Sequence, residues 1–402
     1  MKKGLIVGLA LVAALAIAIA SCSRAGDADT VVATTASGDA TTASTMAPLT
    51  TATAVIETTL VALTQEPMTV KYATRFNEGD AGGKVIRRFI DYVEQATGGA
   101  VTFEVFYGGA LGSDLEELGL VGSGSVDMTS LALPAYADRL PLANFPLWAA
   151  PDAQAAIDYA HHLVLDEPKT SLLIQAEAGV SNILFLGFTS GGGNMFVSRP
   201  ALTGLADLAG KRFGASGFGP ALEALGCEIV KTNSTRMHDA LAAGAFEATR
   251  ASFKGSIDLK LYEVAKHFVW DGVYGAGSPI VVNLDTWAML TPETRAVFYK
   301  AAGAAADLSL ELDSAYVNEQ LQLLAGAGVT VGSLGAEDID TWYQLLFDYS
   351  AQGCMSRAQT LGIVDDMVTV LTEAARSAGV SWSPLVATTT TVVPGTTTTG
   401  SR

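Results

Sequence analysis

The chain has 402 residues, of which 49% are hydrophobic, 24 are Lys or Arg and 41 are Asp or Glu, so its formal net charge is −17 at pH 7. This length allows about two or three domains with buried cores. The acidic balance argues against nucleic acid and anionic lipid surfaces as partners, because both require compensating positive charge. Three cysteines and four histidines exclude a disulfide scaffold and a four-cysteine zinc ribbon and leave little material for a metal site.

The N-terminus has the features of an export signal. Lys2 and Lys3 precede an uncharged stretch, residues 4–21, that is rich in Leu, Ile, Val and Ala and ends in small residues before Cys22. A signal peptidase accepts small residues before its cleavage point. A cysteine directly after them resembles the bacterial lipoprotein box, so we expect residues 1–22 to be a lipoprotein signal and Cys22 to be lipidated. An ordinary secretory signal and a membrane-spanning anchor are the alternatives, and all three place the remaining chain outside the cytoplasm.

Two Thr-rich segments flank the folded part of the chain. Residues 23–66 are rich in Thr and Ala, contain no aromatic residue and have one basic residue, Arg24. Such a composition buries too little apolar surface to offset chain entropy, so we expect a disordered tether. Residues 384–402 repeat the pattern with two runs of four Thr and are expected to form a disordered tail. The folded unit is therefore about residues 67–383.

The folded unit begins with an alternation of strands and helices. Short segments in which apolar and polar side chains alternate predict strands, and a longer segment with apolar residues on one helical face, ended by a Gly pair, predicts a helix. The predicted elements are, in chain order, strand 68–74, helix 82–96, strand 101–107, helix 114–121 and strand 126–133. This order is typical of a parallel α/β sheet.

The same alternation recurs further along the chain. The predicted elements are strand 183–187, strand 211–215, helix 220–225, strand 227–231, helix 237–243, strand 248–253 and strand 279–284. The last of these is apolar and β-branched, which suits a buried strand. The recurrence predicts a second α/β lobe.

A long helix is expected to connect the two lobes. Thr291, Pro292 and Glu293 supply an N-cap, a proline at the first helical position and an acid in the first turn. The helical pattern then continues to Leu324, which corresponds to roughly 50 Å at about 1.5 Å per residue. Two α/β lobes with a bridging helix describe a clamshell, whose cleft opens at the carboxyl ends of the strands. We assign residues 67–190 and about 280–320 to the first lobe with the bridging helix, and residues 191–279 and about 321–383 to the second lobe.

The sequence approaches two enzyme motifs but completes neither. Residues 79–85 (GDAGGKV) approach a P-loop, but Glu78 stands in place of the first glycine and Val85 in place of the Ser or Thr that holds magnesium. Residues 214–218 miss a nucleophile elbow because Phe218 takes the place of the second glycine. We therefore expect neither an enzyme nor a cofactor.

The histidines and the remaining cysteines suggest little further chemistry. His161 and His162 are adjacent, so they point to different sides of a helix, and we interpret them as a solvated pair rather than as metal ligands. Cys227 and Cys354 lie far apart in the sequence. In an oxidising compartment they could form a disulfide or remain two buried free thiols.

Several motifs in the folded unit resemble one known family when their order is considered. They are GGAVTFEVF (98–106), GALGSD (109–114), GSVDM (124–128), PL with FP (141–146), LADLAG (205–210), YEVAK (262–266), Asn283 with Trp287, and the long helix from Pro292. Their order and spacing are similar to those of the solute-binding proteins of tripartite ATP-independent periplasmic (TRAP) transporters, the DctP family. The resemblance covers about residues 68–370.

The resemblance implies a fold and a function. The fold would be the two-lobed, type II-like clamshell of periplasmic binding proteins. The chain would be an extracytoplasmic receptor that closes on a small solute, an organic acid or a related polar molecule, and delivers it to membrane permease subunits. We expect a monomer that is anchored to the membrane by the lipid at Cys22 and has no nucleic-acid partner. A ligand-binding module for a membrane sensor and a secreted hydrolase are the alternatives.

The sequence departs from the family where the family binds carboxylates. Many members have an arginine in the pattern G-x-K-x-R at a strand end of the second lobe, and Gly214 takes its place here. A second family arginine, near the lobe junction, corresponds to Gly193 or Asn194. An arginine fork matches two carboxylate oxygens, so these replacements leave the identity of the solute open.

Other residues are candidates for the binding site. Arg250 and Lys254 could supply a displaced cation or be solvated loop charges, and Arg75 is expected to face the cleft. Aromatic side chains could line the pocket or belong to the core, and an acid at a helix start could accept a hydrogen bond from the solute or cap its helix. The predicted ligand-binding residues are Arg75, Asp114, Asn194, Gly214, Phe218, Arg250, Phe253 and Lys254.

Overall fold

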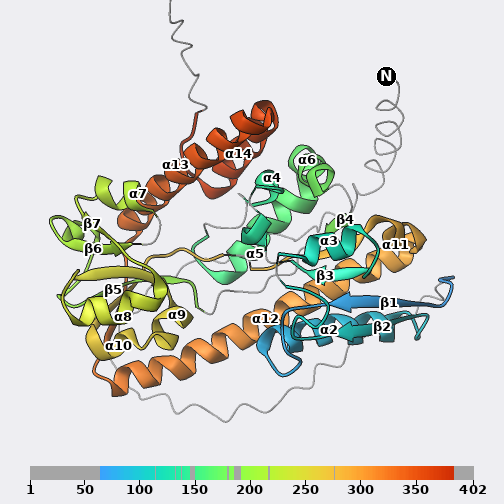
Figure 1. Cartoon of the computed structure of the whole chain (residues 1–402), viewed down its shortest axis with the longest axis horizontal. Coiled ribbons are helices and arrows are strands. Elements are labelled where there is room, and N and C mark those ends of the chain that lie inside the picture. Colours follow the sequence, from blue (N-terminus) through green and yellow to red (C-terminus); the bar gives the residue numbers. More distant parts are fainter. Residues whose placement is uncertain are drawn as a thin grey trace, which may run out of the picture. The chain divides into compact units, whose positions relative to one another are not determined.

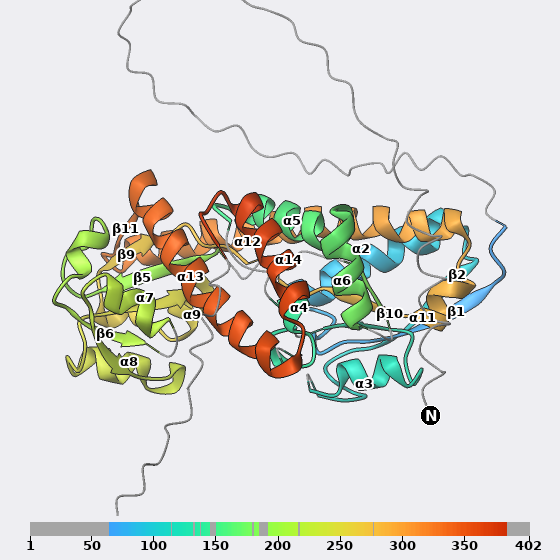
Figure 2. The same cartoon turned by 90° about the horizontal axis from the view of Figure 1, so that it is seen from above.

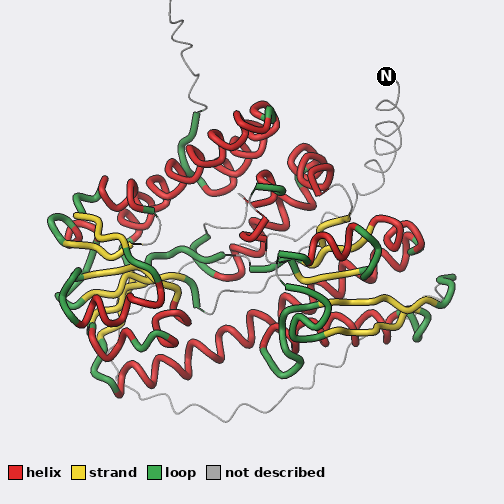
Figure 3. Tube along the Cα trace, viewed as in Figure 1, coloured by secondary structure: helices red, strands yellow, loops and turns green. Residues whose placement is uncertain are grey.

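The structure is a computed structural model that describes residues 64–383 apart from residues 114, 132, 137, 145–149, 179–180, 185–191, 216–217 and 276. The predicted lipoprotein signal with Cys22, most of the predicted tether, the C-terminal tail and Asp114 lie outside the described residues. Two sheets surrounded by helices form the described part (Figures 1 and 3). The α/β fold class predicted from the sequence is therefore confirmed.

The first sheet has five strands in the described chain. They are β1 (Met68–Ala73), β2 (Val101–Phe106), β3 (Met128–Ser130), β4 (Ser181–Leu184) and β10 (Ile280–Asn283). Their order is β2-β1-β3-β10-β4, in which β1 runs parallel to β2 and β3 while β10 runs antiparallel to β3 and β4. The alternation that predicts β1 buries Val70 and Tyr72 and leaves Thr69 and Lys71 exposed.

The second sheet has six strands in the described chain. They are β5 (Asn194–Ser198), β6 (Arg212–Ala215), β7 (Glu228–Lys231), β8 (Ala248–Ser252), β9 (His267–Trp270) and β11 (Thr330–Ser333). Their order is β11-β9-β5-β8-β6-β7. Strand β6 is parallel to β7 and β8, and β11 is parallel to β9, whereas β5 is antiparallel to β8 and β9.

Both sheets are mixed rather than purely parallel, which corrects the sequence-based expectation. The antiparallel strand in each case, β5 or β10, is the first one that the chain forms after leaving the other sheet. Such a strand enters at the edge where its parallel neighbours end, so it runs in the opposite direction. The βαβ alternation of the sequence describes only the strands that follow a crossover helix.

Helices surround both sheets in the described chain (Figures 1 and 2). They are α2 (Ala81–Ala96), α3 (Glu117–Gly122), η1 (Leu133–Tyr136), α4 (Pro141–Asn144), α5 (Ala153–His161), η2 (His162–Asp166), α6 (Pro168–Ala178), η3 (Leu205–Leu208), α7 (Gly219–Ala224), α8 (Ser234–Ala242), α9 (Phe253–Asp258), α10 (Leu261–Val264), α11 (Leu284–Met289), α12 (Pro292–Gly326), α13 (Ala336–Leu361) and α14 (Val364–Ala378). None of these helices combines the length and the apolar character that a membrane span requires.

The long helix α12 contacts the cores of both sheets, as predicted. Thr291 caps its start by accepting a hydrogen bond from the backbone N–H of Thr294 at 3.2 Å. Phe298 near its N-terminus packs in the first sheet's core against Phe89 of α2, with ring centroids 5.5 Å apart. Leu324 near its C-terminus belongs to a core cluster of the second sheet. Figures 1 and 2 show α12 in orange passing from one sheet to the other.

A second helix, α13, also contacts both cores. Trp342 and Leu346 pack against the second sheet. Ala351 and Ala358 pack in a cluster that includes Ala73 of the first sheet and residues of α14. The sequence interpretation stops at the Gly residues after α12 and does not contain this helix. The two lobes are therefore joined by two long helices.

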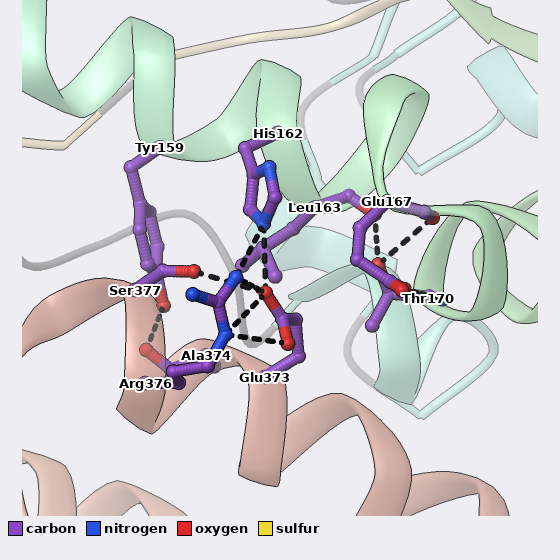
Figure 4. Close-up of polar contacts among 9 residues, drawn as sticks. All are labelled: Tyr159, His162, Leu163, Glu167, Thr170, Glu373, Ala374, Arg376 and Ser377. Atoms are coloured by element: carbon purple, nitrogen blue, oxygen red, sulfur yellow. Dashed lines mark hydrogen bonds and ion pairs between the residues drawn. The ribbon is translucent and has the colours of Figure 1, made fainter. Parts of the chain in front are cut away.

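The adjacent histidines are not simply a solvated pair, because one of them has a distant partner. Helix α5 ends at His161, and the π-helical turn η2 begins at His162. His162 Nε2 lies 2.7 Å from Glu373 Oε1 on α14, and Arg376 bonds the same carboxylate (Figure 4). The partner lies 211 residues away in the sequence, so local spacing cannot reveal it.

The two described cysteines are free thiols. Cys227 is buried in the core of the second sheet, while Cys354 is partly buried against the cluster that contains α14. The structure thus decides between the two possibilities that the sequence leaves open. Burial raises the pKa of each thiol to about 11.

Candidate functional site

The connection from β9 to β10 crosses between the sheets at the edges where the parallel strands end. Strand β9 runs parallel to β8, because both are antiparallel to β5, so β9 ends at the carboxyl edge of the second sheet. Strand β10 is antiparallel to β3 and so begins at the carboxyl edge of the first sheet. The connection 271–279 therefore joins the two carboxyl edges. In open α/β sheets, ligands bind outside these edges.

Arg75 lies at the carboxyl edge of the first sheet, two residues after β1. Its Nη1 donates to the carbonyl of Ser130 at 3.0 Å, and its Nη2 donates to the hydroxyl of Ser278 at 2.5 Å. Glu117 Oε1 is 3.8 Å from Nη1, and its side chain is 4% exposed against 23% for Arg75. The buried carboxylate of Glu117 thus compensates the positive charge of Arg75.

Arg250 lies on β8 of the second sheet and bonds a fully buried carboxylate. Its Nε donates to Asp271 Oδ2 at 2.5 Å; the two side chains are 11% and 0% exposed. The guanidinium carbon lies 5.2 Å from the ring centroid of Phe218 and 5.8 Å from that of Trp342. Arg250 Nη2 is buried and has no hydrogen-bond partner among the described residues. A buried donor of this kind is what a polar ligand group can satisfy.

Asp271 is held in place by several donors. Besides Arg250, it accepts hydrogen bonds from the indole N–H of Trp342 at 3.3 Å and from the backbone N–H of Val273 at 2.9 Å. The hydroxyl of Tyr343 donates to the carbonyl of Gly272. Since Ser278 bonds Arg75, the single connection 271–279 fastens the predicted arginines of both sheets.

Gly214 faces an aromatic ring, and so does Gly193, one of the two residues that correspond to the second family arginine. A Cβ on Gly193 would lie 2.7 Å from Cζ of Tyr274, and φ there is +71°. A Cβ on Gly214 would lie 2.6 Å from the ring of Phe246. Neither position has room for a side chain. The carbonyl of Gly214 accepts a hydrogen bond from the Thr249 hydroxyl at 2.7 Å.

The connection into β5 is fastened in a similar way. The side-chain amide of Asn194 donates to the carbonyl of Val273 at 2.9 Å, and the backbone N–H of Gly192 donates to Asp313 Oδ1 on α12, also at 2.9 Å. Asn194 therefore lies beside the connection 271–279. Its amide group is used by the backbone of that connection.

The remaining predicted residues differ in their surroundings. Phe218 adopts a left-handed backbone conformation with φ of 59° and packs edge-on against Tyr349. Phe253 is fully buried and stacks on Trp270 with centroids 4.9 Å apart; Trp270 in turn stacks on Tyr274. Lys254 pairs with Asp258 at 2.6 Å, with about half of each side chain exposed, and its Nζ lies 5.9 Å from the ring centroid of Tyr316.

The structure thus brings Phe218 and Arg250 together and places Asn194, the first residue of β5, beside the connection 271–279. Phe253 is buried against Trp270. The sequence interpretation includes Phe218 but misses Asp271, Glu117 and Trp342, the other aromatic residue next to the Arg250 guanidinium. A signal for Asp271 does exist, because an Asp-Gly pair directly follows the apolar run 267–270 at a strand end, but β9 is not predicted.

Negative charge surrounds the connection 271–279. The pKa of Tyr274 is raised by burial and by the carboxylates of Asp313, Asp152 and Asp271. Burial, together with Asp271 and Asp152, also raises the pKa of Tyr343. The carboxylates of Asp313 and Asp152 therefore add to the negative charge near this connection.

One pocket of the described chain lies apart from the predicted site residues. A pocket of about 250 Å³ at the outer edge of the second sheet is lined by residues of β9 and β11 and by Leu202 and Thr203, and it contains none of the predicted site residues. Within the described ranges, no group of three or more His, Cys, Asp or Glu side chains is arranged to hold a metal ion.

Comparison with known proteins identifies the family to which this chain is similar. The family model of bacterial extracellular solute-binding proteins, family 7 (DctP), matches residues 72–352. The C4-dicarboxylate-binding periplasmic protein DctP of Rhodobacter capsulatus is 25% identical over 285 residues, which cover 70% of this chain and 85% of the relative.

Two solved structures are similar in fold. A TRAP periplasmic solute-binding protein from Rhodobacter sphaeroides, in an apo open form, has a TM-score of 0.64 at 21% identity and covers 76% of this chain and 98% of its own. The ectoine-binding protein TeaA of the TeaABC TRAP transporter has a TM-score of 0.63 at 17% identity, over 78% of this chain and 99% of its own. The resemblance found in the sequence is confirmed, and the chain belongs to the DctP family of extracytoplasmic solute-binding receptors of TRAP transporters.

Proposed function

We propose that this receptor captures one small solute, an organic acid or a related polar molecule, at the carboxyl edges of its two sheets and delivers it to membrane permease subunits. The observation that carries the proposal is the connection 271–279, which fastens Arg75 of one edge and Arg250 of the other. Relatives that bind a C4-dicarboxylate and ectoine support a solute of this size and polarity. The chain performs no catalysis in this role.

Capture follows from lobe closure. Solute contacts that form only in the closed state shift the equilibrium between open and closed forms. The permease then recognises the closed receptor. The long helices α12 and α13 contact both cores, so they join the two lobes as the lobes close.

Arg250 is the proposed anchor for the solute. Its buried Nη2 has a hydrogen available, and the Phe218 and Trp342 rings restrain its guanidinium plane. Arg75, Asn194 and Phe253 are proposed to shape the site from neighbouring elements, and Asp114 and Gly214 to border it. Lys254 is the weakest of the proposed residues because Asp258 already pairs with its ammonium group.

The lobe boundaries, the anchor and the assembly are proposed together with this function. Residues 67–190 with about 280–320 form the first lobe and the bridging helix, and residues 191–279 with about 321–383 form the second. The receptor is a monomer attached to the membrane through a lipid on Cys22. Cys22→Ser is expected to release it from the membrane fraction into the detergent-free soluble fraction. Retention of the variant in the membrane would contradict the lipid anchor.

A thermal-shift screen tests the receptor role. A ligand that binds the folded state raises the unfolding temperature by mass action, with about 2.7 kcal/mol gained at a concentration of 100 times Kd. The exported Cys22→Ser chain is screened against carboxylates, amides, sugars and compatible solutes. We expect one chemical class to stabilise the chain with a stoichiometry of one. Stabilisation by none of these classes would contradict the proposal.

A further inference from the structure

The charge of the candidate site can be counted almost completely. The residues between 64 and 383 that the structure does not describe include a single charged residue, Asp114. Every Lys and Arg of the folded unit is therefore described. Each of the three cations predicted for the site has a carboxylate partner: Glu117 for Arg75 at 3.8 Å, Asp271 for Arg250 at 2.5 Å and Asp258 for Lys254 at 2.6 Å.

Additional carboxylates lie near the candidate site. Asp313 of α12 accepts the hydrogen bond of the Gly192 backbone. Together with Asp152 and Asp271, it raises the pKa of Tyr274 on the connection between the sheets. The site therefore has more acidic than basic side chains, and its two arginines are already compensated.

We infer that the solute is a zwitterion, which carries a cationic nitrogen group beside its carboxylate, rather than an organic anion. This inference rests on the proposed function and narrows its solute class. The carboxylate of the solute accepts a hydrogen bond from Arg250 Nη2, which is buried and has no partner among the described residues. The cationic group faces the negative charge of Asp313 and Asp152.

The physical reason is the cost of burying an uncompensated charge. A carboxylate that leaves water needs both hydrogen bonds and an opposite charge. Asp271 already neutralises Arg250, so a simple acid would bring the closed site to a net negative charge. A zwitterion brings its own compensation and also neutralises part of the acidic surplus.

Isosteric pairs of solutes test this inference. In each pair, a quaternary nitrogen in the zwitterion is replaced by carbon in the acid: glycine betaine with 3,3-dimethylbutyrate, 4-trimethylammoniobutyrate with 5,5-dimethylhexanoate, and N-methylnicotinate with 3-methylbenzoate. Succinate and malonate are added as dianions. Affinities are measured by calorimetry on the exported Cys22→Ser chain. We expect the zwitterion of the best-fitting pair to bind at least tenfold more tightly than its isostere and than either dianion.

The outcomes separate this inference from the proposed function. Tighter binding of an acid or dianion would overturn the zwitterion inference and leave the receptor function in place. A lack of saturable binding by every zwitterion would overturn the inference, and the receptor function would be contradicted as well only if the amides and sugars of the thermal-shift screen also failed to bind.

Charge-neutralising variants provide the matched control. Asp271→Asn keeps the shape of the side chain but leaves Arg250 uncompensated, so the affinity ratio of zwitterion to acid should fall about tenfold. Glu117→Gln removes the carboxylate that pairs with Arg75 at the other edge and should change the affinity ratio in the same direction. It serves as the second test if Asp271→Asn folds poorly. Asp91→Asn removes an equal charge from an exposed site on α2 and should leave the ratio unchanged. A constant ratio in both site variants would overturn the inference.

Discussion

Gly193 lies so close to Tyr274 that a Cβ at this position would be 2.7 Å from the tyrosine ring. The backbone of Gly193 also has a positive φ of 71°, a conformation that side chains of L-residues disfavour. The ring therefore occupies the space that a side chain on Gly193 would take, and Gly193 or Asn194 is the position that corresponds to the second family arginine. The close packing fixes the connection into β5 against the connection out of β9.

Gly193→Ala should destabilise the protein strongly. The added methyl group meets both the ring and the backbone strain, which together cost about 2–5 kcal/mol. Chemical denaturation measures the change in the free energy of unfolding. Gly303→Ala is the control, because Gly303 lies within α12 with nothing near its Cβ position, and it should stabilise the protein by about 0.5–1 kcal/mol. Equal effects of both substitutions would contradict the packing of Gly193.

Substitutions of Arg250 should separate solute binding from folding. Arg250→Met leaves Asp271 buried without a counter-charge and should cost about 3–5 kcal/mol of folding free energy. Arg250→Lys retains the charge but loses the planar fork; it should weaken solute binding at least tenfold with a smaller loss of stability. Thermal unfolding and calorimetric titration measure the two effects. Wild-type affinity in the lysine variant would show that the Arg250 fork does not contact the solute.

Acid should weaken the contact between η2 and α14. The Arg376 guanidinium, followed in importance by the hydrogen bond from His162, lowers the pKa of Glu373 to about 2 from its ordinary 4.5 (Figure 4). Because the folded-state pKa is the lower one, the stabilisation is present above pH 4.5 and is lost as the pH falls toward 2. The stability difference between the wild type and Glu373→Gln should shrink over that range. A pH-independent difference for Glu373→Gln would exclude this linkage.

The two free thiols should react slowly in the folded protein. Burial raises the pKa of both Cys227 and Cys354 to about 11, so few thiolates exist at pH 8. In the Cys22→Ser chain, an aromatic disulfide reagent should label both residues quickly only after guanidinium is added. Rapid labelling of both thiols under native conditions would contradict their burial.

Local patterns were sufficient to predict much of the framework. Side-chain alternation predicts β1 and β2, and the cap at Thr291 predicts the start of α12 at Pro292. Strands β5, β9 and β11 are short and lack an extended alternation, so their pairing with distant partners determines them. Helix α13 has apolar residues for two different cores, and its periodicity is correspondingly weak.

The candidate site could be predicted only in part. Arg75 and Arg250 are visible as basic residues near strand ends. The residues that determine their charge state, Glu117 and Asp271, come from elements 42 and 21 residues away in sequence. Tyr274 fills the space at Gly193 through a contact of the same long-range kind. A single sequence contains no local signal for such contacts.

Small-angle X-ray scattering tests lobe closure most directly. The Cys22→Ser chain is measured alone and with a saturating concentration of whichever solute raises its unfolding temperature. We predict a smaller radius of gyration in the bound state, because the two sheets approach each other around the solute. A bound solute that leaves the radius of gyration unchanged would contradict capture by closure.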